Sequence, residues 1–81
     1  MENLTDKKEY IQSVVGTNIR RIRIEKKLSQ RDLADLCNFE TSNMCRIEQG
    51  GSNLTLMNLY KISIALRVDI RELFNGIISG K

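Results

Sequence analysis

The residues best suited to chemistry lie in one short polar segment near the middle of the 81-residue chain. Thr41 and Ser42 carry hydroxyl groups, and Arg46 follows them about one helical turn later. On a helix, this spacing places the three side chains opposite the apolar residues Met44 and Ile47. A hydroxyl can contact a base edge or a thymine methyl group, and an arginine can bond O6 and N7 of guanine together. The segment therefore favours recognition of bases in a DNA groove.

The composition excludes most catalytic sites. The chain has no histidine, which rules out Ser/His/Asp and Cys/His active sites and Cys2His2 zinc sites. The two cysteines, Cys37 and Cys45, are too few for a zinc site and lack the C-x-x-C spacing of a redox pair. We interpret them as reduced thiols, with a redox-sensing disulfide as the alternative. We therefore expect no enzyme, no catalytic or metal site and no cofactor.

Basic residues gather just before the polar segment. The whole chain has 13 Lys and Arg against 10 Asp and Glu, a formal net charge of +3. Within residues 18–31, six basic residues surround a single carboxylate, Glu25. They are Arg20, Arg21, Arg23, Lys26, Lys27 and Arg31. A local surplus of cations is what neutralisation of DNA phosphates requires. For any one of these residues, a solvated helix face is the alternative interpretation.

Recurring start signals divide the chain into helices. Each has an apolar residue before a capping residue and a second apolar residue five positions after the first, which is the hydrophobic staple. The four pairs are Leu28/Leu33, Phe39/Met44, Leu54/Leu59 and Val68/Leu73. Capping-box partners are added by Ser29 with Asp32 and by Asp69 with Glu72. The signals predict helices over residues 30–37, 41–49, 56–66 and 70–75.

A longer helix is predicted before these, from about residue 6 to residue 27. Asp6 and Glu9 can cap its start, and Gly16 could bend or break it. Its expected inner face is Ile11, Val15, Ile19 and Ile22. The expected inner residues of the helix over 30–37 are Leu33, Ala34, Leu36 and Cys37. No alternating strand pattern of useful length competes with these helices.

The chain is therefore expected to form one all-α domain of five helices over residues 1–81. The core would cover about residues 14–75, with a helical N-terminal extension over 5–15 and a short C-terminal tail over 76–81. The longest apolar runs are two or three residues, so no membrane span is expected. The first nine residues are polar and charged, which is unlike a signal peptide, and the expected location is the cytoplasm.

The helices predicted over 30–37 and 41–49 are short and are joined by only three residues. That is the geometry of a helix-turn-helix, whose second helix lies in the DNA major groove. The runs NIRRIR at 18–23, LSQRDLA at 28–34 and MCRIEQG at 44–50 resemble the XRE family of lambda-repressor-like helix-turn-helix regulators. The run LYKISIALRV at 59–68, followed by LF at 73–74, continues the pattern, so the resemblance covers about residues 14–75. It implies a lambda-repressor-like DNA-binding domain and a sequence-specific transcriptional regulator.

The resemblance also implies roles for individual residues. The base-reading positions correspond to Glu40, Thr41, Ser42 and Arg46. The positions that contact the DNA backbone correspond to Arg23, Ser29, Gln30, Asn43, Gln49, Ser52 and Asn53. Arg23 and Glu48 also occupy the positions of a buried structural ion pair. Glu40 departs from the family's small capping residue, so it either selects a cytosine amino group or simply caps the helix.

One recognition helix covers about half a turn of DNA, so a homodimer on a pseudo-palindromic operator is expected. The candidates for its interface are Ile64, Ile70, Phe74, Ile77 and Ile78. Alternatively, Ile70 and Phe74 complete the core. The chain leaves little room for a small-molecule site, so no such ligand is expected. The stretch Asn53-Leu54-Thr55 resembles restriction–modification controllers of the family, and a small phage-type repressor is a second possibility. A different hypothesis is an antitoxin or adapter domain whose main partner is a protein.

Overall fold

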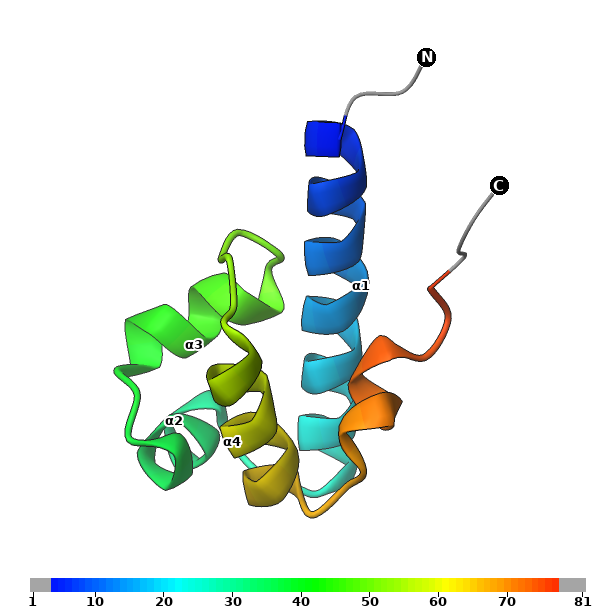
Figure 1. Cartoon of the computed structure of the whole chain (residues 1–81). Coiled ribbons are helices and arrows are strands. Elements are labelled where there is room, and N and C mark those ends of the chain that lie inside the picture. Colours follow the sequence, from blue (N-terminus) through cyan, green and yellow to red (C-terminus); the bar gives the residue numbers. More distant parts are fainter. Residues whose placement is uncertain (1–3, 78–81) are drawn as a thin grey trace.

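A computed structural model describes the backbone of residues 4–77 and the side chains of residues 7–77 (Figure 1). Four α-helices follow one another: α1 (Leu4–Glu25), α2 (Gln30–Cys37), α3 (Thr41–Glu48) and α4 (Leu56–Leu66). A short 3-10 helix, η1 (Ile70–Phe74), completes the order, and residues 4–77 contain no strand. The all-α prediction is confirmed. The expected fifth α-helix is wrong, because that segment winds as a 3-10 helix.

The 3-10 winding of η1 follows from the bonds that Asp69 makes at its start. The Asp69 carboxylate accepts hydrogen bonds from the backbone N–H and the guanidinium of Arg71, and its backbone carbonyl accepts from the N–H of Glu72, three residues on. These bonds hold the tight winding of a 3-10 turn. The predicted Asp69/Glu72 capping box is therefore wrong, because Asp69 pairs with Arg71 instead.

Helix α1 is the structural spine of the domain. Figure 1 shows α3 and α4 on one side of it and η1 against its C-terminal half. It starts at Leu4, before the predicted Asp6 cap, whose side chain lies outside the described residues, and it ends at Glu25. Lys27 ends the following turn with a φ of 63°, in the left-handed region, which cannot continue a right-handed helix.

Gly16 does not bend α1, which continues through it without a break. A Cβ atom at this position would lie 2.5 Å from the carbonyl oxygen of Ile47 and 2.8 Å from that of Glu48. Real Cβ atoms do not approach backbone oxygens so closely. Gly16 therefore allows the C-terminal end of α3 to pack directly on the α1 backbone.

The capping residues of α2 and α4 act as the sequence predicts. The Ser29 hydroxyl accepts a hydrogen bond from the N–H of Asp32, and the Asp32 carboxylate accepts one from the N–H of Ser29. Thr55 caps α4 through the N–H of Asn58. Asn38 ends α2 with a φ of 60°, as expected of a residue that tolerates the left-handed region.

The core forms between α1 and the other helices, and eleven buried residues build it. They are Val15, Ile19, Ile22, Leu33, Ala34, Cys37, Met44, Ile47, Ile62, Leu66 and Leu73. Two predicted core residues are exposed instead. Ile11 is 44% exposed, since the N-terminal part of α1 extends past the other elements (Figure 1). Leu36 is 61% exposed, because Leu33, Ala34 and Cys37 define the buried face of α2 and Leu36 lies on its flank.

A buried polar residue that the sequence did not single out holds η1 against α1. The Asn18 side-chain amide donates to the carbonyl oxygens of Leu73 at 3.0 Å and Asn75 at 2.8 Å. Leu73 lies in the last turn of η1 and Asn75 directly follows it, where helix carbonyls lack partners within the helix. Among the described residues, no helix is both long and apolar enough to cross a membrane.

Candidate nucleic-acid interface

Helices α2 and α3 contact each other and are joined by residues 38–40. Phe39 is half-buried against the core, and Met44 and Ile47 of α3 are buried in it. The opposite face of α3 presents Thr41, Ser42 and Arg46 to solvent, as the sequence predicts. Asn43 is half-buried on the same helix, and Gln49, just after it, is exposed. The apolar face of this short helix is thus packed in the core, and its polar face remains exposed.

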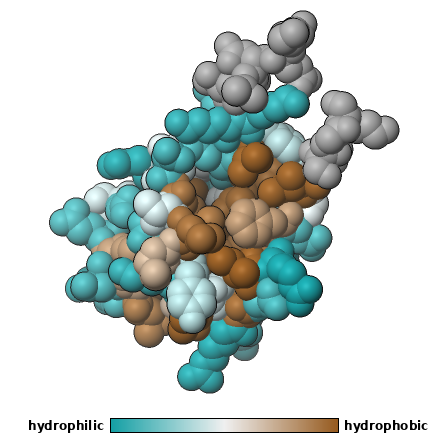
Figure 2. Space-filling view, in the orientation of Figure 1, coloured by the Kyte–Doolittle hydropathy of each residue, from teal (hydrophilic) through white to brown (hydrophobic). Residues whose placement is uncertain are grey.

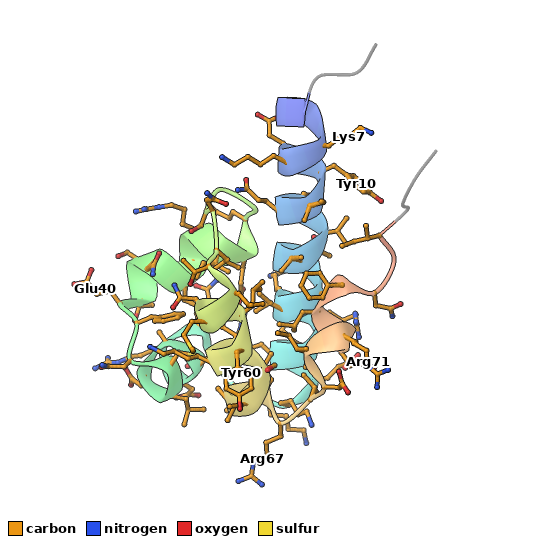
Figure 3. All side chains as sticks on the ribbon, in the orientation of Figure 1. Lys7, Tyr10, Glu40, Tyr60, Arg67 and Arg71 are labelled. Carbon is orange, nitrogen blue, oxygen red and sulfur yellow. The ribbon has the colours of Figure 1, made fainter. Side chains whose placement is uncertain are left out.

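Glu40 stands at the start of α3 with extended backbone angles, φ −75° and ψ 147°. Its side chain makes no capping hydrogen bond, and Figure 3 shows it pointing away from the domain. The interpretation of Glu40 as a simple side-chain cap is therefore wrong. The carboxylate remains exposed beside Thr41 and Ser42, where it adds negative charge to an otherwise hydroxyl-rich helix start.

Arg23 and Glu48 form an ion pair between α1 and α3. Arg23 Nε lies 2.6 Å from Glu48 Oε2, and Arg23 Nη2 lies 3.0 Å from Glu48 Oε1. The third guanidinium nitrogen, Nη1, donates to the carbonyl oxygen of Leu28 at 2.8 Å. Arg23 is only 8% exposed. Its three nitrogens already bond to protein atoms, so this geometry favours the structural role over contact with a phosphate.

Gln30, the first residue of α2, extends this network. Its side-chain nitrogen Nε2 donates to Glu48 Oε1 at 3.0 Å. An amide nitrogen carries two hydrogens, so one donor of Gln30 remains for an external acceptor. The Glu48 carboxylate thereby orients the side chain at the N-terminus of α2, where free backbone N–H groups also favour an anion.

Next to Gln30, a shallow polar pocket of about 560 Å³ lies between α1, the start of α2 and the end of α3. Thr17, Arg20 and Arg21 of α1 line it together with Gln30 and Gln49. The basic cluster in the sequence predicted phosphate contacts for Arg20 and Arg21, but it did not predict the pocket. Thr17 was missed, although its spacing of three and four residues from the two arginines places it on their face of α1. Two guanidinium groups beside a helix N-terminus suit a phosphate.

The remaining predicted backbone-binding residues do not line the polar pocket. Ser29 is exposed, but its hydroxyl oxygen caps α2. Ser52 and Asn53 belong to the loop between α3 and α4 and line a second groove, of about 360 Å³, with Lys8 and Gln12. The structure therefore does not bring Ser52 and Asn53 into the polar pocket.

Neither cysteine takes part in a disulfide, since Cys37 and Cys45 are both free. Burial raises the pKa of the Cys37 thiol, an effect that the nearby Lys61 ammonium partly opposes. The thiolate is the reactive form, so a raised pKa makes the buried Cys37 thiol unreactive.

An apolar surface extends over α4 and η1 on the face shown in Figure 2. Of the predicted interface residues, Ile64 is 56% and Phe74 is 37% exposed, whereas Ile70 and Ile77 are half-buried against the core. Ile78 lies outside the described residues. The sequence analysis missed three exposed apolar side chains of α4: Leu56, Met57 and Tyr60. Figure 3 shows Tyr60 projecting from α4, and a spacing of four residues from Leu56 through Tyr60 to Ile64 was the available signal.

A short helix, a tight turn and a second helix with an exposed polar face define a helix-turn-helix domain. A model of the helix-turn-helix family HTH_3 matches residues 19–73, from the middle of α1 into η1. The chain therefore belongs to this family of XRE-type DNA-binding transcriptional regulators, which confirms the resemblance found in the sequence.

The relatives of this chain include restriction–modification control proteins. It is 36% identical over 63 residues to control protein C.MunI of a Mycoplasma species, a match that covers 76% of this chain and 85% of C.MunI. It is 36% identical over 66 residues to control protein C.BamHI of Bacillus amyloliquefaciens, covering 80% of this chain and 82% of that protein. The crystal structure of the restriction–modification controller C.AhdI from Aeromonas hydrophila matches with a TM-score of 0.76 at 36% identity, covering 78% and 96% of the two chains.

Proposed function

We propose that this protein regulates transcription as a homodimer that places α3 in the major groove of a pseudo-palindromic operator. The observation that carries the proposal is the two-faced construction of α3. Met44 and Ile47 are buried, whereas Thr41, Ser42 and Arg46 are exposed one turn apart. A helix held rigidly by one face can present the other to base edges at a fixed depth. One domain over residues 1–81, with its core over about 14–75, is sufficient for this role.

Three kinds of base contact are assigned to the exposed face. Arg46 has the reach and the paired donors to bond O6 and N7 of a guanine. Thr41 and Ser42 stand at the N-terminal end of α3, where their short side chains suit a thymine methyl group or a base edge. The Glu40 carboxylate makes no capping hydrogen bond to α3. It suits the amino group of a cytosine, because it accepts hydrogen bonds and repels phosphates.

Phosphate contacts are assigned to the surroundings of the polar pocket. One phosphate is assigned to the space between α1 and α2. Its contacts would come from the free donor of Gln30, the arginines of α1 and the side chain of Gln49. Ser29, Asn43, Ser52 and Asn53 are assigned to further backbone contacts. Such contacts hold the domain in register on the duplex without selecting sequence.

The dimer interface is assigned to the apolar surface of α4 and η1. Exposed apolar side chains that lie together on one face mark an interaction surface rather than ordinary solvent exposure. Tyr60 and Phe74 form its centre, Ile64 lies at its edge, and Ile70 and Ile77 support it from the core side. A two-fold axis there would make the same patch face itself in the two subunits.

The identity of the relatives favours a controller role within a restriction–modification system. C.MunI and C.BamHI are both control proteins, and each is matched over more than four-fifths of its length. In such a role, the concentration of the dimer would itself be the regulatory signal.

Two measurements test this proposal. Binding to duplex DNA should weaken steeply as salt rises, since several phosphate contacts release counterions. Sedimentation equilibrium should show a dimer that Tyr60→Glu converts to a monomer, whereas Arg31→Glu, an exposed change on α2, leaves the dimer intact. A salt-independent affinity would contradict DNA binding, and a monomer that binds operator DNA fully would contradict the dimer.

A further inference from the structure

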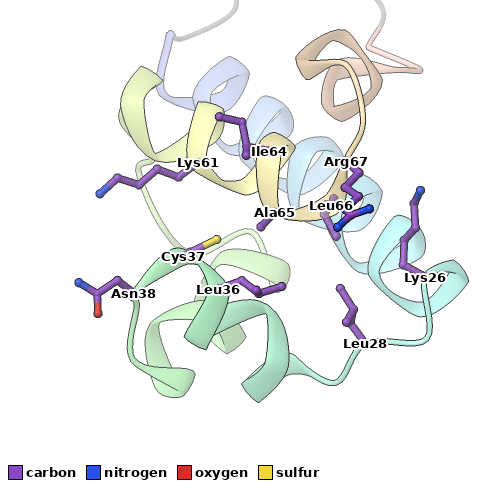
Figure 4. A pocket seen from close by; sticks show the side chains of 10 residues that line it. All are labelled: Lys26, Leu28, Leu36, Cys37, Asn38, Lys61, Ile64, Ala65, Leu66 and Arg67. Atoms are coloured by element: carbon purple, nitrogen blue, oxygen red, sulfur yellow. The ribbon is translucent and has the colours of Figure 1, made fainter.

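A third hollow, a cleft of about 840 Å³, lies between α2 and α4 (Figure 4). We call it the α2–α4 cleft. Its floor is apolar: Leu36 and Ile64 are 61% and 56% exposed in it, and Cys37 and Leu66 are buried beneath them. Leu36 is the predicted core residue that the fold leaves in solvent. Exposed leucine and isoleucine on facing helices indicate a surface for an apolar partner.

The charged residues of the α2–α4 cleft are all basic, and the exposed amide of Asn38 also lines it. Lys61, Lys26 and Arg67 line it, and no carboxylate does. Figure 4 shows Lys61 at one end and Lys26 and Arg67 at the other, with the apolar floor between them. None of the three cations forms an ion pair with another described residue. Three unneutralised cations around an apolar floor complement a ligand that is both acidic and apolar.

The favourable effect of cations at the negative C-terminal ends of helices does not explain the whole arrangement of basic and apolar residues in the cleft. Lys26 and Arg67 follow the C-terminal ends of α1 and α4, where a cation is favourable. Lys61, however, lies in the middle of α4, where no helix end explains it, and the exposed apolar side chains of Leu36 and Ile64 carry no charge that could compensate one. DNA is a poor match as well, since a phosphate backbone offers no apolar surface to the floor.

We propose that the α2–α4 cleft binds an acidic amphipathic helix of a partner protein. This goes beyond reading of an operator, because Leu36, Lys61 and Arg67 of the cleft are assigned neither to DNA nor to the dimer surface. The volume lies within the range of about 300–1,000 Å³ in which proteins enclose a compact ligand. Leucine-type side chains of the partner helix would enter between Leu36 and Ile64, and its carboxylates would face Lys61, Lys26 and Arg67.

The test uses the full chain and a fluorescent synthetic peptide of about 15 residues, long enough to form a helix. Its leucines follow a spacing of three and four, and glutamate fills the remaining positions. A second peptide has lysine in place of every glutamate. Fluorescence anisotropy at low salt should show that the acidic peptide binds at least about tenfold more tightly than the basic one.

Three variants locate the binding site. Lys61→Glu and Leu36→Ser should each weaken binding of the acidic peptide about tenfold, and both positions are exposed, so the fold is not at risk. Arg67→Gly should weaken it as well, and glycine suits the positive φ of 60° at this position. Lys8→Glu, on α1 and outside the cleft, makes the same charge change as Lys61→Glu and should leave binding unchanged.

Four outcomes would overturn the proposal. The first is no binding of the acidic peptide at low salt, and the second is equal binding of the basic peptide. The third is an equal loss with Lys8→Glu, which would make the attraction a matter of net charge. The fourth is displacement of the peptide by duplex DNA or by dimer formation, which would assign the cleft to one of those interfaces.

Discussion

Arg23 and Glu48 are joined across the α1–α3 contact by two parallel hydrogen bonds, of 2.6 Å and 3.0 Å. The Glu48 side chain is 1% accessible and also accepts a bond from Gln30, so three helices meet at one buried carboxylate. The C-terminal end of α3 is thereby fixed to α2, which begins at Gln30, the expected phosphate contact. The orientation of the exposed polar face of α3, the proposed base-reading face, and the position of Gln30 depend on the same carboxylate.

Removal of Glu48 should therefore destabilise the fold strongly. Glu48→Ala leaves the Arg23 guanidinium buried without its partner, and the free energy of unfolding should fall by about 3–5 kcal/mol. Urea denaturation measures this value. The control is Glu25→Ala, which breaks an exposed pair with Arg21 (3.3 Å) and should cost no more than about 1 kcal/mol. Similar losses in the two variants would show that the buried pair contributes nothing special.

Gly16→Ala should also destabilise the protein, against the usual preference of helices for alanine. The intrinsic gain is about 1 kcal/mol, but the added Cβ would meet the carbonyl oxygens of Ile47 and Glu48 at 2.5 and 2.8 Å. Displacing α3 should outweigh that gain and give a net loss of about 1–3 kcal/mol in urea denaturation. Ser13→Ala, exposed on the same helix, should change stability by less than about 0.5 kcal/mol. A stabilised Gly16→Ala protein would contradict the close packing.

Local signals predicted most of the fold, whereas contacts between distant segments escaped them. The staple of Phe39 and Met44 predicted where α3 begins, because capping depends only on neighbouring residues. Gly16 could not be interpreted in this way, since its role depends on the end of α3. Leu36 fits the apolar pattern of α2, but no residue of α4 covers it.

The candidate site shows the same division. The polar face of α3 follows from helical periodicity and was predicted from the sequence. The Glu40 side chain makes no capping hydrogen bond, and Gln30 donates to Glu48. Both features depend on side-chain geometry, which spacing in the sequence does not determine. The spacing of Thr17 from Arg20 and Arg21 places it on their face of α1, but its position beside Gln30 depends on how α1 packs against α2.

Stability should depend on Asp32 in a defined pH range. Hydrogen bonds from the backbone and the side chain of Ser29 lower the pKa of the Asp32 carboxyl. A carboxyl with a lowered pKa in the folded state stabilises the fold above its unfolded pKa, about 4, and loses this effect as pH falls through the folded value. Asp32→Asn should thus be less stable than the wild type at neutral pH, and the difference should shrink below about pH 4.

Urea denaturation over a pH series checks the role of Asp32. Asp35→Asn removes an exposed carboxylate from the same helix without altering the capping box, and it controls for net charge. If the difference between Asp32→Asn and the wild type stays constant down to about pH 2, the hydrogen bonds of Ser29 do not favour the ionised carboxyl.

Arg46 and Gln30 should affect DNA binding in different ways. Arg46→Ala should cost about 1–3 kcal/mol on the preferred site and remove the preference at one base pair. Gln30→Ala should weaken binding to all sequences with little change in preference, because a phosphate contact carries no sequence information. Titration of a preferred duplex and its single-base variants measures both effects. A uniform loss for Arg46→Ala, or a selective loss for Gln30→Ala, would reverse the two assignments.

The most direct measurement is selection of bound duplexes from a randomised pool, followed by sequencing. A homodimer that reads DNA through α3 should enrich two inverted half-sites with centres about 10–11 base pairs apart. Each half-site should contain a guanine that loses its preference in Arg46→Ala. Enrichment of a single unrepeated site would contradict the dimer, and no enrichment at low salt would contradict sequence-specific recognition by α3.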